Sequence, residues 1–285
     1  MDHDLTIDEK RVYADRTGAD EVLIAAEQGA VVASLSDDRV GEFGLDYRAA
    51  VRDVAAEGNR RAVATDEDVL VGDYDPTDFG PAVAVGFHDG ALLAAGPGGQ
   101  VARLDDGWTT LGSVKTPRAI DGGMVAAESG VHQVVDDGLR NVGLGGVHDV
   151  VGRGLPLAAT DRGLYRLGNG WMDELDGAFR VVASEEPRSS GGREADGSEA
   201  SETPRATGEA GDRTHAVGEA GVFAREAVDD WRAVDVPTDA PVDVGYTEAA
   251  TVAVTETGTL LADAGDGWRT RELGVTGVRR LAVQA

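Results

Sequence analysis

Six acidic residues recur at one position of a repeated sequence pattern, and they are the side chains whose type and spacing could form a site together. They are Glu27, Asp66, Glu128, Asp161, Glu219 and Glu256, and we call them the phased acids. In most copies a small apolar run precedes the acid and a Gly follows two positions later, as in Ala126-Ala127-Glu128-Ser129-Gly130. A ring of carboxylates on one face would attract a cation or a basic partner.

Turn chemistry on an acidic surface is the simpler explanation of the phased acids, because Asp and related residues favour the first position of a turn. Carboxylates on separate repeats are also expected to lie too far apart for one calcium ion, whose oxygen ligands sit about 2.3–2.6 Å away. We therefore predict no metal at this ring and keep it only as a candidate binding face.

No other group of residues has the spacing of a known reaction centre. The chain has no Cys and no G-x-S-x-G nucleophile motif. Its five histidines, none of which forms a zinc motif such as H-E-x-x-H, are His3, His88, His132, His148 and His215. We predict no catalytic residue, no cofactor and no metal ligand, and expect each His to be structural or solvated.

The charge composition excludes some partners. The 285 residues carry a formal net charge of −26, and only Lys10 and Lys115 among the 26 basic residues are Lys. A phosphate backbone needs a basic face, so no nucleic-acid partner is expected. An acid excess spread over the whole chain indicates a salt-rich cytoplasm, where salt screens self-repulsion. Because the sequence lacks a long apolar segment and an apolar leader, we expect a cytoplasmic monomer that does not bind membranes.

The phased acids belong to a repeat with anchors at positions 29, 68, 99, 130, 163, 221 and 258. The anchors are 31 to 39 residues apart, except for one interval of 58. Each of the four Trp residues follows an anchor by eight to ten positions, and they are Trp108, Trp171, Trp231 and Trp268. A feature that repeats in phase is usually structural, so we expect hydrophobic pegs that seal adjacent sheets rather than platforms for sugars or bases.

Each repeat reads as four short strands. Residues 147–175 contain four runs of about five residues separated by Gly-rich breaks, and Asn169-Gly170 is a strong hairpin signal. Stacking such sheets radially buries both faces of each one. We therefore predict an all-β chain, one β-propeller over 1–285 with seven four-stranded blades, or six if the weak second copy is no blade. The segment 278–283 is predicted to close the ring by joining the blade near 22–46.

The interval of 58 residues contains a segment of different composition. Residues 185–213 are rich in Ser, Gly, Pro, Glu and Arg and lack Leu, Ile, Val, Phe, Tyr and Trp. Such a segment cannot bury enough apolar surface to offset its ordering entropy. We predict a disordered acidic insert between the first two strands of the sixth blade, on the face opposite the phased acids.

The Gly anchors, the Asp/Asn-Gly hairpin pairs and the following Trp resemble degenerate Asp-box repeats, as in sialidase-like and photosystem II assembly-factor propellers. The Ser and Thr of a full Asp box are mostly missing. The acidity, the scarcity of Lys and the opening Lys10-Arg11-Val12-Tyr13-Ala14-Asp15-Arg16 resemble a haloarchaeal β-propeller family. These resemblances imply a fold and a lineage, and no activity, because fold alone does not determine function.

The sequence supports two classes of function. The leading hypothesis is a non-enzymatic interaction scaffold with a protein partner. The alternative is a sialidase-like or other sugar-active enzyme, or a ligand sensor, with its site at the mouth of the central channel. Such an enzyme would need Arg and acid residues near the axis. First-strand candidates of these types are Arg52, Asp53, Arg118, Asp121, Asp149, Arg180 and Asp243, and His148 is also expected to approach the channel.

Overall fold

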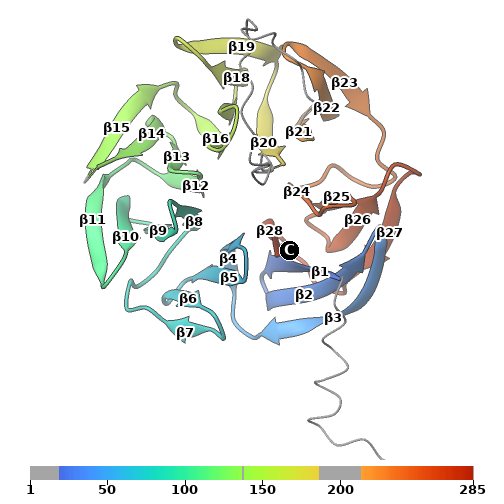
Figure 1. Ribbon diagram of the computed structural model, residues 1–285, viewed down its shortest axis with the longest axis horizontal. Coiled ribbons are helices and arrows are strands. Elements are labelled where there is room, and N and C mark those ends of the chain that lie inside the picture. The colour runs from blue at the N-terminus through green and yellow to red at the C-terminus, as the bar shows by residue number, and fades with distance from the viewer. Residues whose placement is uncertain (1–18, 137, 186–212, 285) are drawn as a thin grey trace, which may run out of the picture.

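Seven four-stranded antiparallel sheets form a ring around a central axis in the computed structural model, which describes residues 19–136, 138–185 and 213–284 (Figure 1). Each sheet is one blade of a β-propeller, and its first strand lies nearest the axis. The predicted all-β architecture with seven blades is therefore confirmed. Among the described residues, no helix is long and apolar enough to cross a membrane.

The first four blades hold the following strands. Blade one contains β28 (Arg280–Gln284), β1 (Asp20–Ala26), β2 (Gly29–Ser36) and β3 (Arg39–Tyr47). Blade two contains β4 (Val51–Glu57), β5 (Arg60–Thr65), β6 (Val69–Val71) and β7 (Asp75–Pro76). Blade three contains β8 (Ala84–His88), β9 (Ala91–Ala95), β10 (Gln100–Leu104) and β11 (Trp108–Ser113). Blade four contains β12 (Pro117–Asp121), β13 (Met124–Ala127), β14 (Gly130–Val135) and β15 (Gly138–Gly143).

The last three blades follow the same order from the axis outward. Blade five contains β16 (Val147–Val151), β17 (Leu157–Thr160), β18 (Gly163–Leu167) and β19 (Trp171–Asp176). Blade six contains β20 (Phe179–Ser184), β21 (Thr214–Gly218), β22 (Gly221–Ala227) and β23 (Asp230–Val234). Blade seven contains β24 (Asp243–Tyr246), β25 (Thr251–Val254), β26 (Thr259–Asp263) and β27 (Arg269–Glu272).

The two ends of the described chain meet in blade one. Strand β28 pairs antiparallel with β1, with Leu281 opposite Ile24 and Val283 opposite Val22. The predicted closure by the C-terminal strand is therefore confirmed. The predicted insert 185–213 covers the interval between β20 and β21 of blade six, and it stays a prediction because residues 186–212 lie outside the described residues. Residues 1–18, which include His3 and the opening residues 10–16, also lie outside the described residues.

Apolar clusters between neighbouring blades form the core. One cluster joins Val22, Ile24 and Leu35 of blade one to Val252 and Leu260 of blade seven, all of them buried. Because each blade buries both faces against its neighbours, the strands are rich in Ala, Val and Leu.

The Trp side chains lie between blades, as the repeat predicts. Trp108 and Trp171 pack against inter-blade clusters and donate their indole N–H to the carbonyl oxygens of Thr77 (2.9 Å) and Val142 (2.8 Å) in the preceding blade. Trp231 similarly donates to Glu174 Oε2 at 2.8 Å. The pegs therefore combine apolar contact with a hydrogen bond across the seam.

The repeat anchors need Gly for a steric reason. Gly99 has φ 96° and Gly258 has φ 83°, in the left-handed region that side chains disfavour. A Cβ at either position would lie 2.2 Å from a carbonyl oxygen, that of Val114 or Val275. The Gly periodicity therefore reports a tight turn repeated at the same point of the blade.

Candidate functional site

The innermost strands carry a repeated irregularity that turns one side chain toward one end of the channel. In four blades the pairing of the first strand with the second skips one residue, and the skipped residues are Arg52, Arg118, His148 and Arg180. A β-bulge of this kind redirects the side chain of the extra residue. Arg279 holds the equivalent place beside β28, because its N–H bonds Ala25 O while Arg280 is the residue paired with Ala25. We call these five residues the bulge ring.

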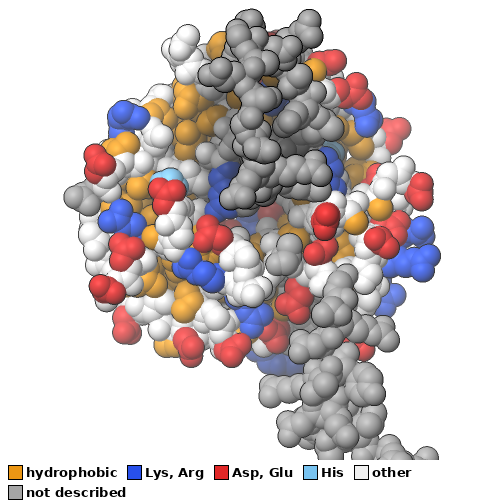
Figure 2. All heavy atoms as spheres, viewed as in Figure 1, with side chains coloured by type: hydrophobic (Ala, Val, Ile, Leu, Met, Phe, Trp, Pro, Cys, Tyr) orange, Lys and Arg blue, Asp and Glu red, His pale blue; other side chains and the backbone are white. Residues whose placement is uncertain are grey.

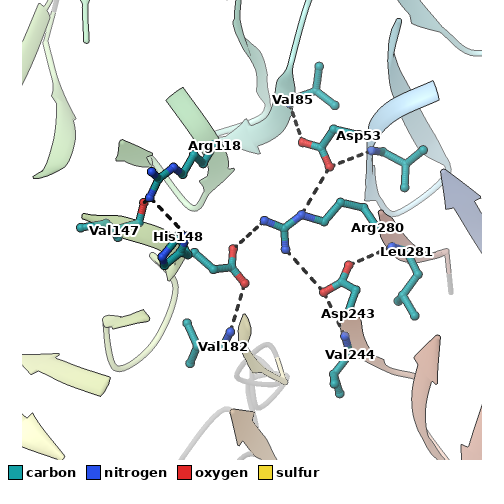
Figure 3. Close-up of polar contacts among 12 residues, drawn as sticks. Asp53, Val85, Arg118, Val147, His148, Val182, Asp243, Val244, Arg280 and Leu281 are labelled. Atoms are coloured by element: carbon teal, nitrogen blue, oxygen red, sulfur yellow. Dashed lines mark hydrogen bonds and ion pairs between the residues drawn. The ribbon is translucent and has the colours of Figure 1, made fainter. Parts of the chain in front are cut away.

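Asp53 and Asp149 follow the bulge residues Arg52 and His148, and Asp243 and Arg280 hold the corresponding positions of blade seven and of β28. Asp53, Asp149 and Asp243 each form an ion pair with the guanidinium of Arg280, and we call these four residues the hub; Figure 3 labels Asp53, Asp243 and Arg280. Arg280 forms ion pairs with Asp149 at 3.1 Å, with Asp243 at 3.6 Å and with Asp53 at 4.0 Å. The three Asp residues are buried, and the Arg280 side chain is 18% exposed.

The three hub carboxylates also connect their own blades, two, five and seven, to the blade that follows each of them. Asp53 accepts a hydrogen bond from the Val85 N–H at 2.9 Å, and Asp149 accepts one from Val182 at 3.0 Å. Asp243 accepts one from Leu281 at 2.8 Å, on the closing strand itself. The oxygens of these candidate acids are therefore occupied by bonds that hold the ring together.

Burial raises the pKa of two hub carboxylates, Asp53 and Asp243. Desolvation raises the pKa of Asp53 to about 7 and the pKa of Asp243 to about 6, although Arg280 and backbone N–H groups oppose the rise. Desolvation likewise raises the pKa of Asp121, whose carboxylate accepts the Gly152 N–H at 2.7 Å. Burial opposes the charge of Arg280, yet the three carboxylates around it raise its pKa, so it stays protonated.

Two cavities flank the hub. The hub cavity, of about 640 Å³, is lined by the hub residues, Asp121 and Arg153, and it reaches Gly58 in the turn between the first and second strands of blade two. The bulge cavity, of about 740 Å³, is lined by Arg118, His148, Arg180 and Arg279 of the bulge ring. Arg280 borders both cavities, so the hub lies between them. Figure 2 shows acidic side chains spread over one face of the ring, with basic ones between them.

All six phased acids lie in turns between the second and third strands of their blades, so they share one face of the ring. Glu27, Glu219 and Glu256 line the bulge cavity. Each of the other three binds a base instead: Asp66 binds Arg52 at 2.6 Å, Glu128 binds Lys115 at 2.5 Å and Asp161 binds His148 at 2.5 Å. These hydrogen bonds lower the pKa of Asp66, of Glu128 and of Asp161.

The phased acids do not converge on one point. Within residues 19–136, 138–185 and 213–284, no group of three or more His, Asp or Glu side chains could hold a metal ion. As a binding face the phased acids remain a prediction, with three of them at the bulge cavity.

The first-strand candidates separate into two levels of the channel. The acids Asp53, Asp149 and Asp243 meet at the hub, whereas Arg52, Arg118 and Arg180 belong to the bulge ring. The sequence analysis missed Arg280, the cation at the centre. A signal for it exists, because Val278-Arg279-Arg280-Leu281 follows the same pattern as Val51-Arg52-Asp53-Val54 and Val147-His148-Asp149-Val150.

His215 illustrates the structural role expected of the histidines. It is buried beside Tyr246, whose hydroxyl lies 2.9 Å from His215 Nδ1. Desolvation lowers the pKa of His215 to about 4, so the ring is neutral at neutral pH. His148 reaches the channel, as the sequence predicts, and it contacts Arg118 at 3.2 Å.

Solved structures share this architecture at low sequence identity. The computationally designed protein Ika8 has a TM-score of 0.58 and 10% identity, covering 91% of this chain and 86% of that one. The extracellular domain of the one-component system BT4673 from B. thetaiotaomicron has a TM-score of 0.57 and 10% identity, covering 82% of this chain but only 36% of that one. YCF48 bound to D1 peptide has a TM-score of 0.55 and 12% identity, covering 77% and 81%.

These structural likenesses show the fold alone. No curated protein matches the sequence. A family match does extend over residues 6–284, which is nearly the whole sequence and all seven blades. The chain therefore belongs to the Beta-prop_HVO_0234-like family of β-propellers.

Proposed function

We propose that this propeller is a non-enzymatic interaction scaffold of a high-salt cytoplasm, and that a protein partner docks on the bulge cavity. The observation that carries the proposal is that the charged side chains of the hub and those of the bulge cavity differ in whether they have partners within the chain. The hub charges are engaged in ion pairs and backbone hydrogen bonds, whereas the guanidinium groups of Arg180 and Arg279 at the bulge cavity form no hydrogen bond or ion pair with any described residue. Exposed guanidinium groups without partners are suited to contacts with another molecule.

The similarity to other propellers is consistent with this proposal. YCF48 is seen with a D1 peptide, so a propeller of this general form can bind a peptide, although 12% identity carries no site from it to this chain. The net charge of −26 supports a salt-rich compartment and argues against nucleic acid as the partner.

A sugar-active enzyme or a sensor is the second candidate function, and one observation favours it. The hub cavity contains Asp53, whose pKa of about 7 would suit a general acid. The bonds of the Asp53 carboxylate to Val85, Val54 and Arg280 count against this role, because a catalytic acid must be free to reach a substrate. Thermal shift with a library of sugars and sugar acids in molar KCl tests this candidate, since a ligand of the native state raises its stability.

Partner capture by matched variants tests the scaffold proposal. The full chain is used to capture proteins in molar KCl, and each recovered protein is purified and titrated against wild type. Reversing two charges in Arg180→Glu, Arg279→Glu should abolish binding. The control is Arg39→Glu, which changes an exposed Arg at the start of β3 on the other face. Binding that survives the double reversal, or the absence of any stoichiometric partner, would contradict the proposal.

A further inference from the structure

We infer that the bulge cavity binds the C-terminal carboxylate of a peptide chain, between Arg180 and Arg279. This inference rests on the proposed function and specifies the chemistry of the partner. Some basic side chains of the bulge ring already have an acidic partner within the chain, and others do not.

Two members of the bulge ring are neutralised within the chain. Arg52 donates to both carboxylate oxygens of Asp66, from Nε and from Nη2, each at 2.6 Å. His148 lies 2.5 Å from Asp161. A guanidinium that already donates two N–H groups to a carboxylate has few donors left for a ligand. Arg52 and His148 are therefore not the recognition groups.

Arg118 has no carboxylate partner within hydrogen-bond or ion-pair distance among the described residues. Its Nη1 donates to the Val147 carbonyl oxygen at 3.0 Å and lies 3.2 Å from His148 Nδ1 (Figure 3). Its charge therefore has no ion-pair partner among the described residues. The hydrogen bond to Val147 holds one end of the guanidinium against β16. Arg118 contributes positive potential to the cavity from a fixed position.

Arg180 and Arg279 are the two remaining residues of the bulge ring. Both side chains are exposed, both border the bulge cavity, and neither forms a hydrogen bond or ion pair with the part of the chain that the structure describes. They stand on β20 and immediately before β28, with blade seven between them. The equivalent position of blade seven is Val242, whose N–H bonds Val254 O. Arg180 and Arg279 therefore line the bulge cavity together with an apolar wall formed by Pro241 and Val242 of blade seven, and the one carboxylate whose pKa Arg279 helps to lower, Asp66, is already bound by Arg52.

Two Arg side chains and an apolar wall in one cavity are suited to bind the C-terminal carboxylate of a peptide. Each guanidinium can take one carboxylate through paired N–H donors, and two of them can hold one carboxylate from both sides. The apolar wall can contact the side chain of the last residue. Capture of a terminal carboxylate is also an established mode of peptide recognition.

The acids at the rim favour a singly charged group over a phosphate. Glu219 lines the same cavity as Arg180, and its N–H bonds the carbonyl of Ala178, two residues before Arg180, at 3.1 Å. Glu256 lines the same cavity as Arg279, and its carbonyl accepts the N–H of Val278, the residue before Arg279, at 3.1 Å. Among the described residues neither carboxylate has a hydrogen bond or ion pair, so both would repel a second negative charge. They would instead attract a basic side chain that precedes the terminal residue of the peptide.

Peptides with and without a free terminus test the inference. The probes are acetylated Gly-Gly-Lys-X tetrapeptides that differ in the last residue X, each made with a C-terminal carboxylate and with a C-terminal amide. Binding to the full chain is measured by calorimetry in molar KCl. The best carboxylate peptides should bind at least about tenfold more tightly than their amides, because the amide removes the charge that both Arg residues recognise.

Matched variants locate the bound group. Arg180→Gln and Arg279→Gln should each weaken the carboxylate peptides by about tenfold and leave the amides unchanged, whereas Arg39→Gln on the other face should change neither. Inorganic phosphate should not displace the peptides at concentrations where acetate does. Equal binding of carboxylate and amide, displacement by phosphate alone, or no binding by any peptide would each overturn the inference.

The two proposals can fail separately. If a captured protein partner loses binding in the double charge reversal but no carboxylate peptide binds, the scaffold proposal stands and the terminal carboxylate does not. If carboxylate peptides bind but no protein partner depends on Arg180 and Arg279, the cavity recognises small carboxylates and the scaffold proposal fails.

Discussion

Arg279 and Arg280 are adjacent in sequence, identical in type and opposite in environment. Arg280 lies among three buried carboxylates, whereas the Arg279 side chain is exposed at the bulge cavity and forms no hydrogen bond or ion pair with the described residues. The bulge beside β28 causes the difference, because it sends one side chain to the axis and the other to the mouth of the channel. Two adjacent Arg residues thus differ in role: Arg280 is paired with carboxylates of three other blades, and Arg279 is exposed at the bulge cavity, where we propose that it binds a partner.

Removing both residues at once should have the largest effect. A chain that ends at Thr276 loses β28, the ring closure and the cation that compensates Asp53, Asp149 and Asp243. We expect the loss to exceed the roughly 5–15 kcal/mol by which domains are usually stable, so cooperative unfolding should disappear. Calorimetry in molar KCl measures this, and a chain that ends at Gln284 is the control. A truncated chain with an unchanged melting curve would contradict closure by β28.

Replacing each Arg alone should separate the two environments. Arg280→Met leaves three buried carboxylates without a cation and should lower the free energy of unfolding by about 3–5 kcal/mol, as for other broken buried ion pairs. Arg279→Met removes the same charge from an exposed site and should cost less than about 0.5 kcal/mol. Urea denaturation of both variants in molar KCl provides the comparison. Equal losses would show that the hub has no special structural role.

The hub should also make stability depend on pH. The folded-state pKa of Asp53, about 7, lies above its ordinary value of 3.8, so between these values the folded chain binds more protons than the unfolded chain. Stability from this group is therefore complete below about pH 4 and is lost as the pH rises through 7. Asp243, with a pKa of about 6, acts in the same direction.

A difference measurement isolates the contribution of Asp53. His215 acts in the opposite direction, because its pKa of about 4 lies below the ordinary 6.5. Comparing wild type with Asp53→Asn cancels His215, which both chains keep. Wild type should lose stability relative to Asp53→Asn as the pH rises from 4 to 7, by up to about 1.4 kcal/mol per pH unit. A difference that stays constant, or grows in favour of wild type, would contradict the raised pKa.

The smallest effect on stability is expected at the mouth. The double variant Arg180→Gln, Arg279→Gln removes two exposed charges whose side chains form no hydrogen bond or ion pair with the described residues. Its free energy of unfolding should therefore stay within about 0.5 kcal/mol of wild type. Denaturant titration checks this value. A larger loss would mean that these side chains support the fold, and weaker peptide binding by the variant would then need another explanation.

Local sequence signals predicted much of the architecture. The Gly anchors, the Trp residues in phase with them and the hairpin pairs indicated seven blades, because a turn repeated at a fixed spacing needs the same backbone conformation each time. The segment 278–283 was also recognisable as a strand without a repeat of its own. The candidates Asp53, Asp149 and Asp243 were named, but their meeting point was not, since it joins strands almost two hundred residues apart.

The sequence by itself determined the repeat, the blade, the order of the strands and the acidic surface, because these follow from local turn geometry and from charge that does not depend on neighbours. Only the tertiary structure decided which charges face one another. Ring closure brings Arg280 to three carboxylates from blades two, five and seven, and the bulges assign neighbouring residues to different ends of the channel. Burial then raises the pKa of Asp53, the three carboxylates keep Arg280 charged, and Arg279, one residue earlier, stays exposed at the mouth of the channel.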